Sequence, residues 1–371
     1  MSTPYRPHRP LLETALQTGA SLHRSRYAMI DFLRGIAVLD MMAVHFSHYL
    51  PRLPEKIINY SDFAIEAFIL LAGYMVGRRS YPLYLQEPRT ATVRLLRRAV
   101  EIYAVQCVLI FTISLPVFCI SNPAGDAQQF VLQSIFLLNQ VGIIHILPTF
   151  IPLLLISPLV LFGFSRNRHW WVIAVSIVVF GIGNIHPYLL DMGENTIFPF
   201  ILWQIYFVAG CCLGAGKIGI TLTDAKHMLT AGILLGSIIC IRYAKIIPPE
   251  VISKFPLNAA GVLYGSSLLY FVYSAALAVP GRFTAISGPV FSSIALFGRN
   301  SLLAFVIHVY AAKLIGIMSS GHQKISLDYA LILFSIAAIY VILSFYESRG
   351  RNMIRSVNGY VTRMAGLSGR V

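Results

Sequence analysis

Residues 31–46 read DFLRGIAVLDMMAVHF, an apolar run of helix length that nevertheless contains an arginine and a histidine. Arg34 and His45 are eleven residues apart, and at about 100° per residue this separation is only about 20° from three full turns. Both side chains therefore project from one face of a helix, about 16 Å apart along its axis. Ionisable groups are costly in such a segment, so each needs a partner or a function.

The whole chain is unusually apolar. Of its 371 residues, 57% are hydrophobic and only 12% are charged, whereas soluble domains carry about 25% charged residues. A single water-soluble core does not explain this excess, but a polytopic membrane protein does. We therefore expect an all-α membrane protein. Residues 1–27 are polar and contain four arginines, so we expect no cleavable signal peptide.

Ten apolar runs have the length needed to cross about 30 Å of hydrocarbon, which takes about 20 residues. A shorter run at 130–138 is expected at the interface or as a re-entrant segment. The sequence thus predicts about ten transmembrane helices in one membrane domain, 28–346, between short basic cytoplasmic tails at 1–27 and 347–371. The ten runs lie near 28–50, 60–77, 99–119, 143–164, 169–187, 196–215, 228–247, 257–279, 288–312 and 326–346.

The distribution of Lys and Arg predicts the orientation of the chain. With the N-terminus in the cytoplasm, the inner segments hold 20 of the 29 Lys and Arg residues and the outer segments hold seven. This bias predicts that both termini are cytoplasmic, although the outer stretch 242–254 carries three of the positive charges. We expect a multi-pass protein of the inner (plasma) membrane, with lipid as a partner. The net charge is +14, but the charged residues cluster between apolar blocks, so they do not indicate nucleic acid binding.

Ionisable side chains inside the apolar runs are functional candidates, with a structural ion pair as the alternative for each. Asp40 lies about 140° from His45 on the helical wheel, so it needs a partner on another helix. For a histidine in a membrane helix, packing and function are equally open, and snorkelling to the interface is an alternative for Arg34. Ser301 shares a face with His308, and Arg299 lies on the opposite face. The charged candidates and histidines are Asp31, Arg34, Asp40, His45, His48, Glu66, Glu101, His145, Arg299 and His308.

Two further patterns favour structural roles. Gly73 and Gly77 form a small-xxx-small pair, which indicates close packing of two helices. The five cysteines lie inside apolar runs and none has metal-ligand spacing, so we expect no metal and infer no disulfide.

The motifs resemble a known family. IDFLRGIAVLDMMAVHF (30–46) resembles the opening helix of the acyltransferase-3 superfamily of membrane acyltransferases, whose hallmark is an Arg, ten residues and a His. SDFAIEAFILLAGYMVG (61–77) resembles the second helix of the OpgC branch, with Ala72 where a serine often stands. The segments RRAVEIYAVQ (97–106), FPFILWQIYFVAGCCLG (198–214) and LFGRNSLLAFVIH (296–308) are also similar to OpgC proteins.

The resemblance implies O-acyl transfer across the membrane, from cytoplasmic acyl-CoA to a hydroxyl of a periplasmic or cell-surface glycan. Relatives of OpgC are associated with succinylation of osmoregulated periplasmic glucans, so a succinyl or acetyl group is expected. Acyl-CoA would be a co-substrate, and no bound cofactor is implied. The acyl group, the acceptor and the oligomeric state stay open.

Residue roles follow from the resemblance together with chemistry. A deep histidine can take a proton from a hydroxyl or carry the acyl group itself. We expect His45 to be the base and His308 the second active-site histidine, with Arg34 and Glu66 as further catalytic candidates. Acyl-CoA phosphates would bind Arg34, Arg78, Arg79, Arg97 and Arg98, although topology alone accounts equally well for that basic loop. The remaining site candidates are Asp31, Asp40, Tyr74, Gln204, Arg299 and Ser301.

Transport is the alternative from another class. Ten helices with charges inside the membrane also suit a secondary transporter or a flippase for a polar or anionic substrate. Two similar halves would favour transport, but the ionisable residues concentrate in the first three helices and the ninth. A structural or sensor protein is a third reading, and it predicts that His45 tolerates replacement.

Overall fold

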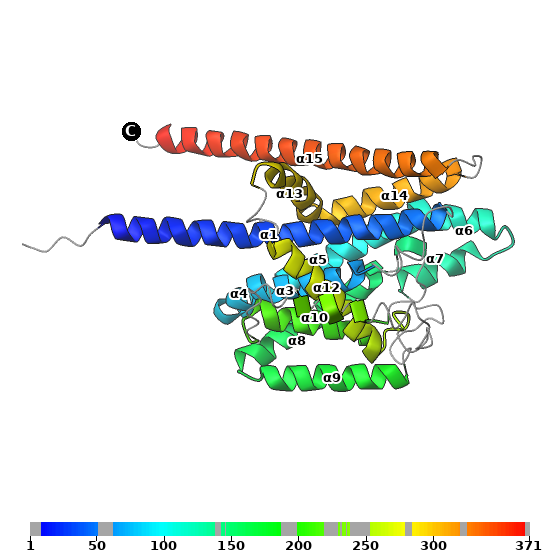
Figure 1. The fold of residues 1–371 in the computed structure, drawn as a ribbon, viewed down its shortest axis with the longest axis horizontal. Coiled ribbons are helices and arrows are strands. Elements are labelled where there is room, and N and C mark those ends of the chain that lie inside the picture. Colours follow the sequence, from blue (N-terminus) through cyan, green and yellow to red (C-terminus); the bar gives the residue numbers. More distant parts are fainter. Residues whose placement is uncertain are drawn as a thin grey trace, which may run out of the picture.

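The computed structural model shows a bundle of helices (Figure 1). It describes residues 9–50, 62–137, 142–144, 146–186, 199–218, 229–230, 232–234, 236–237, 253–278, 284–319 and 325–367. Within these ranges the chain forms no strand, only an isolated antiparallel bridge between Lys254 and Leu257. The predicted all-α fold is therefore confirmed.

Two long helices run antiparallel along the bundle. α1 (Arg9–Tyr49) has 41 residues and α15 (Ile325–Leu367) has 43, so each is about 60 Å long, twice the thickness of the hydrocarbon core. The Arg9 end of α1 and the Leu367 end of α15 lie at the same end of the molecule (Figure 1). α1 and α15 each continue without a break across a predicted boundary of the membrane domain, 28 and 346 respectively. The position of these boundaries stays a prediction.

Residues 64–121 contain two π-helical segments. α3 (Ala64–Met75) continues through the π-helix η1 (Val76–Ser80) into α4 (Tyr81–Gln86). α5 (Pro88–Leu109), the π-helix η2 (Ile110–Ser114) and α6 (Leu115–Ser121) likewise follow one another without a break. The other elements are α7 (Ala127–Ile135), the 3-10 turn η3 (Gly142–Ile144), α8 (Ile146–Ser165), α9 (His169–Ile185), α10 (Phe200–Gly214), α12 (Ala259–Ala278), α13 (Thr284–Arg299) and α14 (Ser301–Ser319).

Several helices have the length and composition of membrane spans. Among the described residues, five qualify: Pro88–Ser121, Ile146–Ser165, Ala259–Ala276, Ser301–Met318 and Ser326–Gly350. α9 and α10 are apolar but shorter. The predicted run at 228–247 falls largely outside the described residues. The total of ten crossings and the orientation in the membrane stay predictions.

The surface of the bundle is that of a protein in lipid. Leu333 and Phe334 on α15 are 68% and 73% exposed, and such outward apolar side chains suit hydrocarbon. Trp170 and Trp171 at the start of α9 are also exposed. They follow Arg168, and tryptophan beside basic residues is typical of the membrane interface.

The single helix predicted at 288–312 is wrong, because the chain breaks there into α13 and α14. Asn300 lies at the break, and its side-chain amide donates a hydrogen bond of 3.1 Å to the carbonyl oxygen of Leu296, which the backbone N–H of Asn300 also uses. Polar side chains that bond to nearby backbone favour helix ends over helix interiors. The helical-wheel relation predicted between Arg299 and His308 therefore does not apply.

Glycines bring α3 and α10 into backbone contact. A Cβ on Gly73 would overlap the carbonyl oxygen of Phe207, and a Cβ on Gly77 would overlap that of Cys211. Gly210 and Gly214 of α10 approach the backbone of α3 in the same way. The close packing predicted from Gly73 and Gly77 is therefore confirmed.

A second glycine contact positions the candidate site. A Cβ on Gly35 of α1 would overlap the carbonyl oxygen of Ile294, and one on Gly298 would overlap that of Asp31. α1 and α13 therefore run antiparallel in close contact. After the break at Asn300, α14 returns beside α1, and this return brings the end of the LFGRNSLLAFVIH segment back to the first helix.

Candidate active site

Two histidines from distant parts of the sequence form a pair between α1 and α14. Nδ1 of His45 lies 2.7 Å from Nε2 of His308, across 263 residues of sequence. The rings are stacked, with centroids 5.0 Å apart and planes inclined by 17°. His308 is completely buried, whereas His45 is partly exposed. We refer to these two residues as the histidine pair.

The surroundings of His308 indicate which nitrogen carries the proton. Its Nδ1 makes no hydrogen bond, and the backbone of Ala304 and Phe305, one turn earlier on α14, is close enough to act on the ring, whose Nε2 already faces His45. Carbonyl oxygens only accept, so they favour a proton on Nδ1 and a lone pair on Nε2. His45 then donates from Nδ1 to His308. In that tautomer the Nε2 of His45 carries a lone pair, as a general base requires.

Arg34 lies on α1 eleven residues before His45, about 16 Å from it along the helix axis. Its Nη2 makes a long hydrogen bond of 3.5 Å to the carbonyl oxygen of Leu71. Asp31, Arg79 and Arg98 are close enough for their charges to act on it. We call Arg34, Arg79 and Arg98 the basic cluster, and it has the composition of an anion site.

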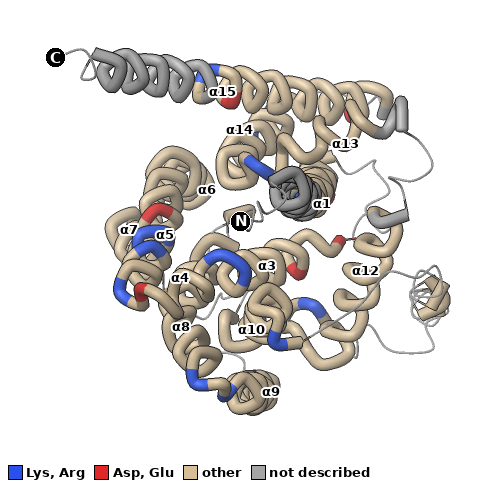
Figure 2. The backbone as a smooth tube through the Cα atoms, turned by 90° about the vertical axis from the view of Figure 1, so that its left-hand side faces the viewer, with Lys and Arg blue, Asp and Glu red and all other residues tan. Residues whose placement is uncertain are grey.

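The other arginines of the predicted phosphate-binding loop lie at the same end of the bundle. Arg97 and Arg98 both pair with Glu101, at 3.3 Å and 3.2 Å. These pairs are exposed, so they contribute little and leave the guanidinium groups able to bind an anion. Arg78 is partly buried and Arg79 exposed in η1. Figure 2, viewed from this end, shows basic residues on the tube from α3 to α5 and near the turn between α8 and α9.

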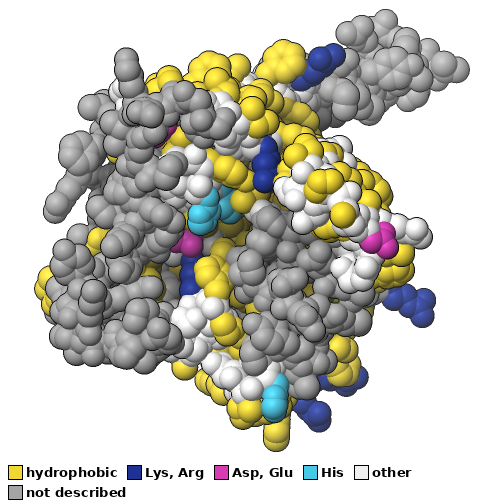
Figure 3. Space-filling model, turned by 90° about the vertical axis from the view of Figure 1, so that its right-hand side faces the viewer, with side chains coloured by type: hydrophobic (Ala, Val, Ile, Leu, Met, Phe, Trp, Pro, Cys, Tyr) yellow, Lys and Arg dark blue, Asp and Glu magenta, His cyan; other side chains and the backbone are white. Residues whose placement is uncertain are grey.

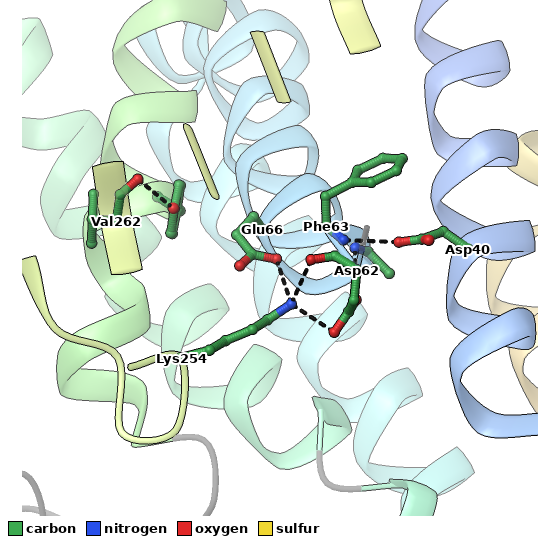
Figure 4. Close-up of polar contacts among 8 residues, drawn as sticks. Asp40, Asp62, Phe63, Glu66, Lys254 and Val262 are labelled. Carbon is green, nitrogen blue, oxygen red and sulfur yellow. Dashed lines mark hydrogen bonds and ion pairs between the residues drawn. The ribbon is translucent and has the colours of Figure 1, made fainter. Parts of the chain in front are cut away.

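Asp40 finds its partner on another helix. Its Oδ2 accepts a hydrogen bond of 2.8 Å from the backbone N–H of Phe63, just before α3 (Figure 4). A carboxylate at this position satisfies a backbone donor and complements the positive end of the helix dipole. Asp40 thus ties α1 to the start of α3.

Glu66 is 2% exposed and forms an ion pair with Lys254 (Figure 4). Nζ of Lys254 lies 3.1 Å from Oε2 of Glu66 and 2.7 Å from Oδ2 of Asp62. Burial alone would lower the pKa of the Lys254 ammonium, but the carboxylates of Glu66 and Asp62 outweigh burial and raise that pKa. The Lys254 ammonium therefore stays charged, and its single positive charge offsets one of the two carboxylates, Glu66 and Asp62.

A glycine and a tyrosine complete the surroundings of Glu66. A Cβ on Gly265 of α12 would lie 2.6 Å from the Tyr206 hydroxyl and 2.9 Å from Oε1 of Glu66, so any larger residue there would displace these side chains. The hydroxyl of Tyr206 donates a hydrogen bond of 3.0 Å to the carbonyl oxygen of Val262. The carboxylate of Glu66 is therefore enclosed by α10, α12 and the loop that carries Lys254.

The remaining candidates lie elsewhere. Gln204 is buried between α9 and α10, where its side chain makes two hydrogen bonds with Ser176, at 2.7 Å and 2.8 Å. Arg299 pairs with Glu347 of α15 at 3.1 Å. Tyr74 is partly buried and presents its backbone to Gly214. Ser301 begins α14, seven residues before His308.

Sequence reasoning missed Lys254 and Asp62 as parts of this region. Lys254 is one of the positive charges at 242–254 that run against the inside bias. An outer lysine that topology does not explain is the signal that it neutralises a membrane carboxylate. Figure 3 shows the end of the molecule opposite to Figure 2, where histidine side chains reach the surface next to acidic and basic side chains.

The chain is therefore a helical membrane protein with a histidine pair, one member of which is completely buried, and a basic cluster at one end. It belongs to the OpgC family, since the family described as OpgC protein matches residues 26–351. This match confirms the resemblance to OpgC and indicates a membrane-associated, glycan-modifying transferase. The wider acyltransferase-3 relationship stays a resemblance. Comparisons with curated proteins and with solved structures gave no match.

Proposed function

We propose that this protein is an integral membrane O-acyltransferase. It moves a succinyl or acetyl group from cytoplasmic acyl-CoA to a hydroxyl of a periplasmic or cell-surface glycan. The observation that carries the proposal is the hydrogen-bonded pair of His45 and His308, in which His45 lies on α1 together with Arg34 and His308 lies on α14.

The proposed chemistry uses one proton and no covalent intermediate. Nε2 of His45 takes the proton from the acceptor hydroxyl, and the hydroxyl oxygen attacks the thioester carbonyl carbon. A C–O bond forms, the C–S bond breaks, and the imidazolium returns the proton to the CoA sulfur. His308 accepts the hydrogen bond from Nδ1 of His45, so it holds the tautomer that this step needs.

The two substrates would reach the histidine pair from opposite ends. The basic cluster lies at the end that holds the start of α1 and the end of α15, which is the predicted cytoplasmic end. Guanidinium groups bind phosphate with two parallel hydrogen bonds, so this end suits the CoA phosphates. The glycan would approach from the other end, past the Glu66–Lys254 pair, and we assign Glu66 to shaping this approach.

The test is acyl transfer in isolated membranes that contain the protein. Labelled succinyl-CoA and acetyl-CoA are supplied separately, and label on extracted glycans is measured by mass spectrometry. We expect label with one donor, and none in membranes that contain the His45→Ala variant. Uptake of a polar anion into vesicles without any labelled glycan would instead establish the transport alternative.

A further inference from the structure

Gln106 on α5 is a buried amide without a hydrogen-bond partner. Its side chain is completely buried, and neither Oε1 nor Nε2 makes a hydrogen bond. Burying an unpaired amide is unfavourable, because the group loses its hydrogen bonds to water and gains none in the protein. Buried polar groups are almost always paired, so an exception calls for an explanation such as a ligand.

The second buried glutamine shows the ordinary arrangement. Gln204 is also nearly fully buried, but its amide both donates to and accepts from Ser176, at 2.8 Å and 2.7 Å. That glutamine joins α9 to α10. The side-chain amide of Gln106 makes no hydrogen bond that would connect α5 to another helix, so it has no comparable structural role.

The contacts of α5 place Gln106 between the basic cluster and the level of the histidine pair. Arg98, eight residues before Gln106, is close enough to Arg34 for the two charges to interact. Thr112, six residues after it, shares a hydrogen bond of 2.7 Å with the hydroxyl of Tyr310, two residues beyond His308. Gln106 is thus about 12 Å along α5 from Arg98.

The buried face of α5 is part of the core that also packs α1 and α14. Ile102 and Leu109 lie on the same helix face as Gln106. They belong to one core cluster with Met41 of α1 and Phe305 of α14. Gln106 is therefore buried inside the bundle, at a height along the α5 segment between Arg98 and Thr112.

We propose that Gln106 binds an amide of the pantetheine arm of acyl-CoA. This inference rests on the proposed function, in which the phosphates lie at the basic cluster and the thioester at the histidine pair. The arm between them carries secondary amides. One amide can accept from Nε2 and donate to Oε1 of Gln106, which satisfies both atoms at once.

The test compares Gln106→Leu with Gln204→Leu in the purified, detergent-solubilised protein. Binding of CoA is measured by calorimetry, so the readout does not depend on acyl transfer. Gln106→Leu should weaken CoA binding about tenfold, as the loss of two neutral hydrogen bonds implies, and should not lower the melting temperature. Gln204→Leu should lower the melting temperature and leave the affinity of the folded fraction unchanged.

A second measurement uses donors of different length. Acyl-CoA and the acyl thioester of ethanethiol, which has no amide, are supplied to wild type and Gln106→Leu. The variant should have an about tenfold higher KM for acyl-CoA and an unchanged kcat/KM for the ethanethiol ester. Equal CoA affinity in wild type and Gln106→Leu, or a lower melting temperature for Gln106→Leu, would overturn the inference. CoA binding without any acyl transfer would overturn the proposed function but leave the assignment of Gln106 standing.

Discussion

Nδ1 of His45 and Nε2 of His308 lie 2.7 Å apart with their rings stacked. Only one of these two nitrogens can hold the shared proton, so the two imidazoles act as a unit with a fixed donor and a fixed acceptor. Because His308 is the completely buried member, it is suited to orient His45 and not to meet the substrates.

The orienting role of His308 predicts a graded response to substitution. His308→Gln keeps an oxygen that can accept from Nδ1 of His45, whereas His308→Leu does not. We expect His308→Gln to retain at least tenfold more acyl transfer than His308→Leu, at equal protein amounts in the membrane. Initial rates with the labelled donor measure this difference. Equal rates for the two variants would remove the orienting role.

The position of Arg34 in the basic cluster predicts a role in donor binding. We expect Arg34→Ala to raise the KM for acyl-CoA about tenfold or more, because a charge-assisted hydrogen bond contributes about 1.5–3 kcal/mol. Arg299→Ala is the matched control, since Arg299 pairs with Glu347 at the surface. Donor saturation by Arg34→Ala that matches the control would reduce Arg34 to an interface anchor.

The backbone contact between α3 and α10 predicts a loss of stability. Gly73→Ala places a methyl group on the carbonyl oxygen of Phe207, so the two helices must separate. We expect a lower melting temperature in detergent and less protein in the membrane. Gly181→Ala is the control, because nothing lies within 4 Å of a Cβ at Gly181 of α9; alanine there should be neutral or stabilising by up to about 1 kcal/mol. A similar effect of both substitutions would contradict the packing account.

The ion pair between Lys254 and Glu66 predicts a strong effect of breaking one partner. Lys254→Met leaves the carboxylate of Glu66 buried without its counter-charge, which typically costs about 3–5 kcal/mol. The double variant Lys254→Met/Glu66→Gln removes both charges and should recover most of the loss. Thermal unfolding in detergent measures both. A double variant as unstable as Lys254→Met alone would show that the loss does not come from an unpaired charge on Glu66.

Local rules predicted much of the helical pattern. Within the described residues, the long apolar runs, the short run at 130–138 and the glycines of the second helix correspond to helices or contacts in the structure. These features depend on nearest neighbours along the chain, so hydropathy and spacing are enough to find them. The break at Asn300 was missed because its cause, one side chain that competes with the backbone, does not change the hydropathy of the run.

The candidate site was only partly predictable. The helical wheel placed Arg34 and His45 on one face, and the resemblance to OpgC pointed to His308. The partners of Asp40 and Glu66 were not predictable, because the backbone of Phe63 and the side chain of Lys254 approach them from other helices and loops. The missing partner of Gln106 is likewise a property of packing and cannot be seen in one sequence.

The most direct test of the account is the His45→Gln variant in proteoliposomes. Glutamine keeps the approximate size and can still donate to His308, but it cannot take a proton at neutral pH. Wild-type and variant protein are given labelled acyl-CoA and glycan, and ester formation is followed by mass spectrometry. The account predicts a loss of about 10²–10⁴-fold in rate, with normal insertion and normal CoA binding. Near wild-type turnover by His45→Gln would contradict it.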